Sequence, residues 1–195
     1  MQWLLPSLLA VAATTSAQLL LDSGRPDDNL PWGSPVSKDQ AIAVQFRSAR
    51  ACGVNQLVDY ANVTVTTKNI DPKATWITLD ICPTVNGLPA CDANAKADKF
   101  KIETVSKRIE FQWVPSTPKT LQPDAHYWLV MTSNVEEMGQ AVIWYDGRTR
   151  FGPTNDPRND VLSAFTLSSA MDWVVDEAKD GRTVASAQIA ARPAA

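Results

Sequence analysis

The chain has 195 residues, of which 45% are hydrophobic and 20% charged. This is the composition of an ordinary globular protein, and it argues against wholesale disorder. With 18 basic and 21 acidic side chains the net charge is -3, so neither nucleic acid nor an anionic membrane is expected as the main partner.

The first 17 residues, MQWLLPSLLAVAATTSA, have the pattern of a secretory signal peptide. The small side chains of Thr15 and Ala17 suit a signal peptidase, so we expect the mature protein to begin at Gln18. The alternative is a buried N-terminal helix. The apolar run is shorter than the roughly 20 residues that a bilayer requires, so we expect no membrane span and a secreted, extracellular protein.

Residues 18–40 are predicted to be an extended leader, because residues 21–40 are rich in Asp, Pro, Gly and Ser. Short β-type runs follow. Apolar and polar residues alternate in several of them, which is typical of strands with one buried face. The run at 126–132, HYWLVMT, is apolar on both parities and predicts a central strand covered on both faces. The predicted strands are 41–46, 60–67, 74–81, 100–105, 109–114, 126–132, 140–146, 171–175 and 183–191.

No long stretch of the sequence has apolar residues at the spacing of an amphipathic helix, and no internal repeat is evident. About nine short strands joined by polar turns predict an all-β fold. We expect a single antiparallel β-sandwich domain over residues 41–195, jelly-roll-like in topology, with its last strand returning to pair within a sheet.

Several short motifs, in chain order, resemble those of the secreted bacterial domains called choice-of-anchor R. The stretch Leu121–Ser133 contains L-x-P-x-x-x-Y-W-L-V, and W-Y-D-G follows at Trp144–Gly147. Upstream, Trp76–Pro89 is similar to the strand-plus-loop segment of that family, and Ala43–Phe46 to its opening strand. The resemblance covers roughly residues 40–190 and implies a jelly-roll-like extracellular sandwich with no catalytic residues to carry over. This chain departs from the family in its added cysteines, and from its last residues we do not expect the C-terminal anchor that those proteins often carry.

An oxidising compartment would allow the cysteines to pair. Cys82 and Cys91 enclose a short loop with Pro, Asn and Gly, so a local disulfide between them is predicted. Cys52 is then left as a free thiol or an intermolecular link, and its pairing with Cys82 or Cys91 stays open. Asn62 begins the only N-glycosylation sequon, Asn62-Val63-Thr64, and its occupancy as a glycoprotein site requires Asn62 to face outward.

The common sequence signatures of serine nucleophiles, zinc sites and phosphate-binding loops are absent, so we assign no catalytic residue. The single histidine, His126, excludes sites with several histidine ligands and is interpreted as a structural residue at a strand start. We expect no cofactor and no metal. The run 155–160, NDPRND, could offer oxygen ligands to Ca²⁺, but these are also turn residues, and a solvated loop is preferred. Candidate acids for a paired-carboxylate mechanism are Asp80, Glu110, Asp146 and Asp172.

The chain has seven tryptophans, and their apolar rings could either fill the core or stack on sugars. We expect Trp113 and Trp128 in the core. Strict alternation places Trp76 on the face of Thr78 and Asp80, away from the core. The candidate ligand-binding residues are Trp76, Trp144 and Tyr145. The leading hypothesis is a secreted, non-catalytic β-sandwich that binds an extracellular or cell-wall glycan. The alternatives are a carbohydrate-active enzyme, such as a glycoside hydrolase or lyase, and a structural or host-interaction protein. The sequence does not predict an oligomeric state.

Overall fold

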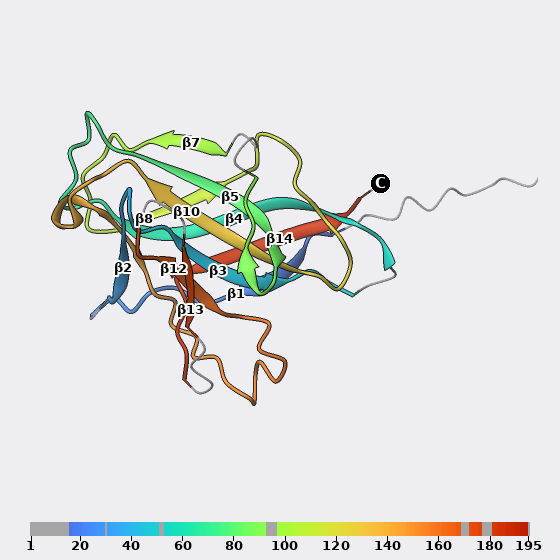
Figure 1. Ribbon diagram of the computed structural model, residues 1–195. Coiled ribbons are helices and arrows are strands. Elements are labelled where there is room, and N and C mark those ends of the chain that lie inside the picture. The colour runs from blue at the N-terminus through green and yellow to red at the C-terminus, as the bar shows by residue number, and fades with distance from the viewer. Residues whose placement is uncertain are drawn as a thin grey trace, which may run out of the picture.

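The computed structural model describes residues 16–29, 31–50, 53–92, 97–168, 172–176 and 181–194. Residues 1–15 of the predicted signal peptide and Cys52 lie outside the described residues. The described chain forms two antiparallel β-sheets that lie face to face (Figure 1). A short 3-10 turn, Met138–Gln140, precedes β11. The predicted all-β antiparallel sandwich is confirmed.

Sheet A is organised around the long strand β4. One edge of β4 pairs with β14 and β11, which continue the sheet to β1 and β2. The other edge pairs with β8 and β9. The strands of sheet A are β1 (Gln18–Asp22), β2 (Gly33–Val36), β4 (Gln56–Thr66), β8 (Ile109–Trp113), β9 (Thr120–Leu121), β11 (Val142–Tyr145) and β14 (Ala187–Pro193).

Sheet B has β10 at its centre, between β3 and β5, as the two-sided apolar run at 126–132 predicts. The sheet extends from β3 to β12 and β13 on one side and from β5 to β6 and β7 on the other. Its strands are β3 (Ile42–Arg47), β5 (Trp76–Val85), β6 (Leu88–Pro89), β7 (Asp98–Lys101), β10 (His126–Ser133), β12 (Ser163–Thr166) and β13 (Trp173–Asp176).

The prediction of an unpacked leader at 18–40 is wrong. Strand β1 pairs with β14, and β2 pairs with β11, so this segment supplies both of these strands to sheet A. Its Gly and Pro residues suggested a loop, but β2 lies at the end of the sheet, where Pro35 can replace a residue whose N–H would have no partner. The folded domain therefore begins at β1.

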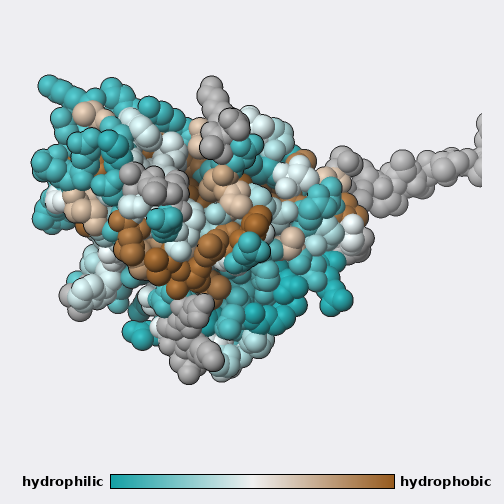
Figure 2. Space-filling view, viewed as in Figure 1, coloured by the Kyte–Doolittle hydropathy of each residue, from teal (hydrophilic) through white to brown (hydrophobic). Residues whose placement is uncertain are grey.

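The main core lies between the sheets and combines alternate residues from both, among them Val63 of β4 and Leu129 of β10. Trp113 and Trp128 are buried, as predicted. Trp128 belongs to a second apolar cluster, with Val130 and Cys82, on the outer side of sheet B. Figure 2 shows apolar residues gathered near the middle of the molecule in this view.

Candidate functional site

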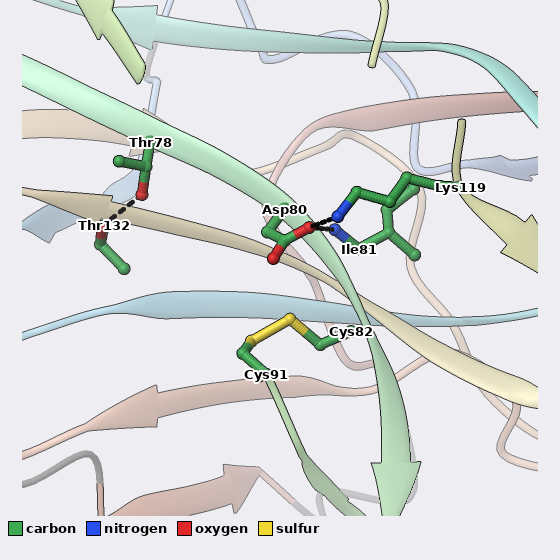
Figure 3. Close-up of a disulfide and its surroundings, with 7 residues drawn as sticks. All are labelled: Thr78, Asp80, Ile81, Cys82, Cys91, Lys119 and Thr132. Atoms are coloured by element: carbon green, nitrogen blue, oxygen red, sulfur yellow. Dashed lines mark hydrogen bonds and ion pairs between the residues drawn. A yellow bond between two sulfur atoms is a disulfide. The ribbon is translucent and has the colours of Figure 1, made fainter. Parts of the chain in front are cut away.

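The disulfide predicted between Cys82 and Cys91 is present, with the Cα atoms 4.8 Å apart (Figure 3). Cys82 lies on β5 opposite Trp128 of β10, so the bridge sits against the buried indole. It ties the segment after β6 to the outer side of sheet B. No helix of the described residues is long and apolar enough to cross a membrane.

Trp144, one of the three predicted ligand-binding residues, is a core residue. Its side chain on β11 is completely buried, and its Nε1 donates a hydrogen bond to the carbonyl oxygen of Ser186 at 2.9 Å. A ring enclosed in this way offers no face to a ligand. The prediction for Trp144 is therefore wrong, because alternation along β11 turns this residue inward and its neighbour Tyr145 outward.

Trp76 lies on the outer face of sheet B, as alternation predicts, and is half-buried. The ammonium group of Lys99 lies 3.9 Å from the centroid of the Trp76 ring. This is a cation–π contact from the neighbouring strand β7, and it occupies one face of the indole. Tyr145 lies in the opposite sheet, so the structure does not bring these two aromatic residues together.

Tyr145 instead lies beside Trp32, a residue that the sequence interpretation did not consider. Both side chains line one hollow on the outer side of sheet A, and Trp32 is the more exposed, at 76% of its surface. The Tyr145 hydroxyl donates a hydrogen bond to the carbonyl oxygen of Lys107 at 2.9 Å, which fixes its ring. The sequence does not indicate Trp32 as a site residue, because it lies in a segment whose composition predicts an unpacked leader.

The backbone next to Trp32 is held closely against β11. Gly33 pairs with Tyr145, and the amide of Asp146 donates to the carbonyl oxygen of Trp32 at 2.8 Å. A Cβ atom added at Gly33 would lie 2.5 Å from the carbonyl oxygen of Trp144. Glycine is therefore required at this position, and its close approach to β11 sets where the Trp32 ring is presented.

A row of amide side chains crosses the same outer face of sheet A. Asn62 of β4 is in register with Gln112 of β8 on one side and with Gln188 of β14 on the other. The Asn62 Nδ2 donates to the Gln188 Oε1 at 3.3 Å, and the Gln188 Nε2 donates to a carboxylate oxygen of Asp22 at 3.1 Å. These three amides line a hollow of about 310 Å³. Asn62 is partly exposed and faces outward, the orientation that occupancy of its sequon requires.

A series of adjoining hollows lies between the amide row and the Trp32–Tyr145 pair, and we call this series the sheet A groove. It consists of four adjoining hollows, each sharing lining residues with the next. The outer faces of β4, β8, β11 and β14 contribute to it together with the chain that precedes β2. An ion pair of Arg25 with Glu110 at 3.5 Å, and one of Arg108 with Asp28, hold that chain against β8. The shared residues are Gly24, Arg25, Pro26, Asp28, Pro31, Thr66, Lys68, Arg108, Glu110 and Tyr145.

The four candidate acids lie in different surroundings. Asp80 is buried on β5, where it forms an ion pair with Lys119 and accepts the backbone N–H of Ile81 (Figure 3). Glu110 lines the sheet A groove, paired with Arg25. Burial raises the pKa of Asp146, which follows β11 directly. Asp172 is exposed beside β13.

His126 is held in a charged cluster at one end of the sandwich. Its Nε2 lies 2.8 Å from a carboxylate oxygen of Asp160, which also accepts from Arg47 at 3.0 Å. Burial by itself raises the pKa of Asp160, but the hydrogen bonds from His126 and Arg47 outweigh burial and hold this pKa below its usual value. The contacts of His126 are those of a structural residue.

The NDPRND run is arranged around a buried ion pair. The carboxylate of Asp156 accepts the backbone N–H groups of Asp160 and Val161 and pairs with the guanidinium of Arg182. Within the described residues, no three His, Cys, Asp or Glu side chains are grouped as a metal site would need. Asp156, the buried carboxylate of this loop, is therefore paired with Arg182.

A comparison of the sequence with models of known protein families found no match. A comparison with curated proteins also found none.

Proposed function

We propose that this protein is a secreted, non-catalytic β-sandwich that binds an extracellular or cell-wall glycan in the sheet A groove. One observation carries the proposal: adjoining hollows on one sheet face run from an exposed tryptophan beside a tyrosine to a row of outward-facing amides. These are the two kinds of surface that a sugar polymer needs, one for its apolar ring faces and one for its hydroxyls.

The two ends of the groove supply different interactions. The rings of Trp32 and Tyr145 offer apolar surface on which the C–H groups of a sugar can pack. The side-chain amides of Asn62, Gln112 and Gln188 each carry both hydrogen-bond donors and an acceptor, which matches the mixed character of hydroxyl groups. Because the groove comprises four adjoining hollows, it suits several linked sugar units better than one.

The extracellular location is part of the proposal. It is supported by the signal-peptide pattern of residues 1–17 and by the Cys82–Cys91 disulfide, which persists in oxidising compartments. The resemblance to choice-of-anchor R domains is compatible with the same location.

Pull-down of the protein by a panel of insoluble and immobilised polysaccharides tests the proposal. We expect binding to at least one of them. Trp32→Ala should weaken this binding about tenfold or more, a loss of about 1.4 kcal/mol of binding free energy. Trp76→Ala is the matched control, because it removes an indole from the opposite sheet. Absence of binding to the whole panel would refute the proposal, and a loss with Trp76→Ala alone would move the site to sheet B.

The same polysaccharides distinguish binding from catalysis. A binding protein releases no soluble sugar, whereas a hydrolase or lyase releases reducing ends or unsaturated products. Product release that Glu110→Gln or Asp146→Asn abolishes would replace the proposal by the enzyme hypothesis. The folding of each variant is verified by circular dichroism.

A further inference from the structure

We infer that the sheet A groove selects glycans whose sugar rings carry anionic groups, an inference that rests on the glycan binding proposed above. The observation behind it is an excess of positive charge in the middle two hollows of the groove. Five cations and three acids line these two hollows, a surplus of two positive charges in a chain whose net charge is -3. They are Arg25, Lys68, Lys107, Arg108 and Arg148, with Asp27, Asp28 and Glu110.

The pairing of these groups leaves the surplus available. Arg25 and Arg108 are matched by Glu110 and Asp28, so those four charges largely cancel. Among the residues that the structure describes, Lys68, Lys107 and Arg148 form no ion pair. Counting only the described part of the chain, three cations without an ion-pair partner therefore line the groove.

One further acid, Asp27, lines the same hollows as these three cations. Asp27 accepts the backbone N–H of Asn29 at 2.9 Å, a contact that holds its carboxylate in a local turn. Its charge offsets that of one cation. The two hollows therefore keep a net charge of two positive units, which can bind the anionic groups of a ligand.

The position of these cations determines which ligand they suit. The two charged hollows lie between the amide row and the Trp32–Tyr145 pair, because they share residues with the hollow at each end. A polymer that spans the groove would pass over Lys68, Lys107 and Arg148. A negatively charged surface elsewhere on the molecule would repel an anionic polymer, so attraction has to come from a local patch of this kind.

The experiment uses two pairs of polymers, and the members of each pair share a sugar backbone but differ in charge. Polygalacturonate is compared with its methyl-esterified form, and dextran sulfate with dextran, so the pairs separate carboxylates from sulfates. We expect the mature protein to bind the charged member of at least one pair more tightly. Binding should weaken as salt rises from about 0.05 M to about 0.5 M, because exposed charges are screened over these concentrations.

Substitutions locate the effect. Lys68→Gln, Lys107→Gln and Arg148→Gln are each expected to weaken binding of the charged polymer about two- to fivefold, as for exposed ion pairs. Lys73→Gln, in the loop before β5, is the matched control and should have no effect. In the three groove variants, binding of the neutral polymers should fall less than binding of the charged ones, whereas Lys73→Gln should change neither.

The outcomes separate this inference from the proposed function. Equal binding of charged and neutral polymers would overturn the inference and leave glycan binding in place. Charge-dependent binding that the three groove variants do not reduce, relative to Lys73→Gln, would also overturn it. Binding to none of the polymers, here or in the wider panel, would overturn both.

Discussion

The buried ion pair of Asp156 and Arg182 gives the sharpest prediction for stability. The two side chains are only 5% and 2% exposed. The Arg182 guanidinium also donates to the carbonyl oxygen of Val161 at 3.0 Å and to the side chain of Asn159 at 3.1 Å. It thereby connects the strand region before β14 to the 155–161 loop. Arg182→Met keeps much of the volume of the side chain but leaves the Asp156 carboxylate without its cation.

Removing one partner of a buried pair costs about 3–5 kcal/mol, since the other charge stays buried without compensation. For a domain of this size, that corresponds to a fall in Tm of about 6–20 °C. Guanidinium-induced unfolding followed by tryptophan fluorescence measures the free energy of unfolding, and differential scanning calorimetry measures Tm.

Arg158→Met is the matched control, because Arg158 lies in the same loop and pairs with Asp160 at 3.2 Å but is 59% exposed. An exposed pair contributes about 0–1 kcal/mol, so this variant should stay close to the wild type. The double variant Asp156→Asn, Arg182→Met should recover part of the loss, because Asn carries no charge and its side-chain oxygen can still accept a backbone N–H. Equal destabilisation by Arg182→Met and Arg158→Met, both below about 1 kcal/mol, would refute the reasoning that burial makes this pair important.

Three further predictions concern the disulfide, the groove and a buried acid. Replacing both Cys82 and Cys91 by Ala should lower the free energy of unfolding by about 2–3 kcal/mol, the entropy of closing so short a loop, as measured by denaturant titration. Gly33→Ala should lower Tm and also weaken glycan binding, because the added Cβ would force β2 away from β11 and displace Trp32; unchanged Tm and binding would contradict the close approach seen here. Because the pKa of Asp146 is raised in the folded state, its stabilising contribution is present below the unfolded pKa and lost as pH rises through the folded pKa. Asp146→Asn should therefore raise Tm at pH 7 and leave it unchanged near pH 3, in a calorimetric pH series.

The sequence predicts most of the sandwich because its buried strands alternate or are apolar on both parities. The run at 126–132 and the alternating runs in β5 and β8 lie where they were expected. Strand β12 was missed, since Ser163–Thr166 is short and carries two hydroxyl residues among four. The last strand was predicted to return into a sheet, and β14 does so between β1 and β4.

Strands at the edge of a sheet are harder to predict, and this determined how much of the candidate site could be found. An edge strand needs ladder hydrogen bonds on one side only, so it tolerates the Gly and Pro residues that ordinarily indicate a loop. The composition of residues 18–40 therefore does not predict β2, and it gives no indication that Trp32, directly before β2, belongs to the site. The same residue types that concealed the strand also make the site, because Gly33 allows the backbone approach that presents the indole.

Of the aromatic residues in the groove, the sequence indicated Tyr145 but not Trp32, nor the side of the molecule on which the two meet. Alternation gave the correct face for Trp76, yet Trp76 and Tyr145 lie in opposite sheets, a separation that depends on strand order and not on local pattern. The amide row has the same origin. Asn62, Gln112 and Gln188 are far apart in the chain and come together only through the registers of β4 with β8 and with β14.

A glycan chain attached at Asn62 would begin on the floor of the sheet A groove, so occupancy of the sequon and binding of an external polymer compete for the same surface. Protein with and without the Asn62 glycan should therefore differ in polysaccharide binding, and Asn62→Gln, which preserves an amide in the row, would keep the groove open.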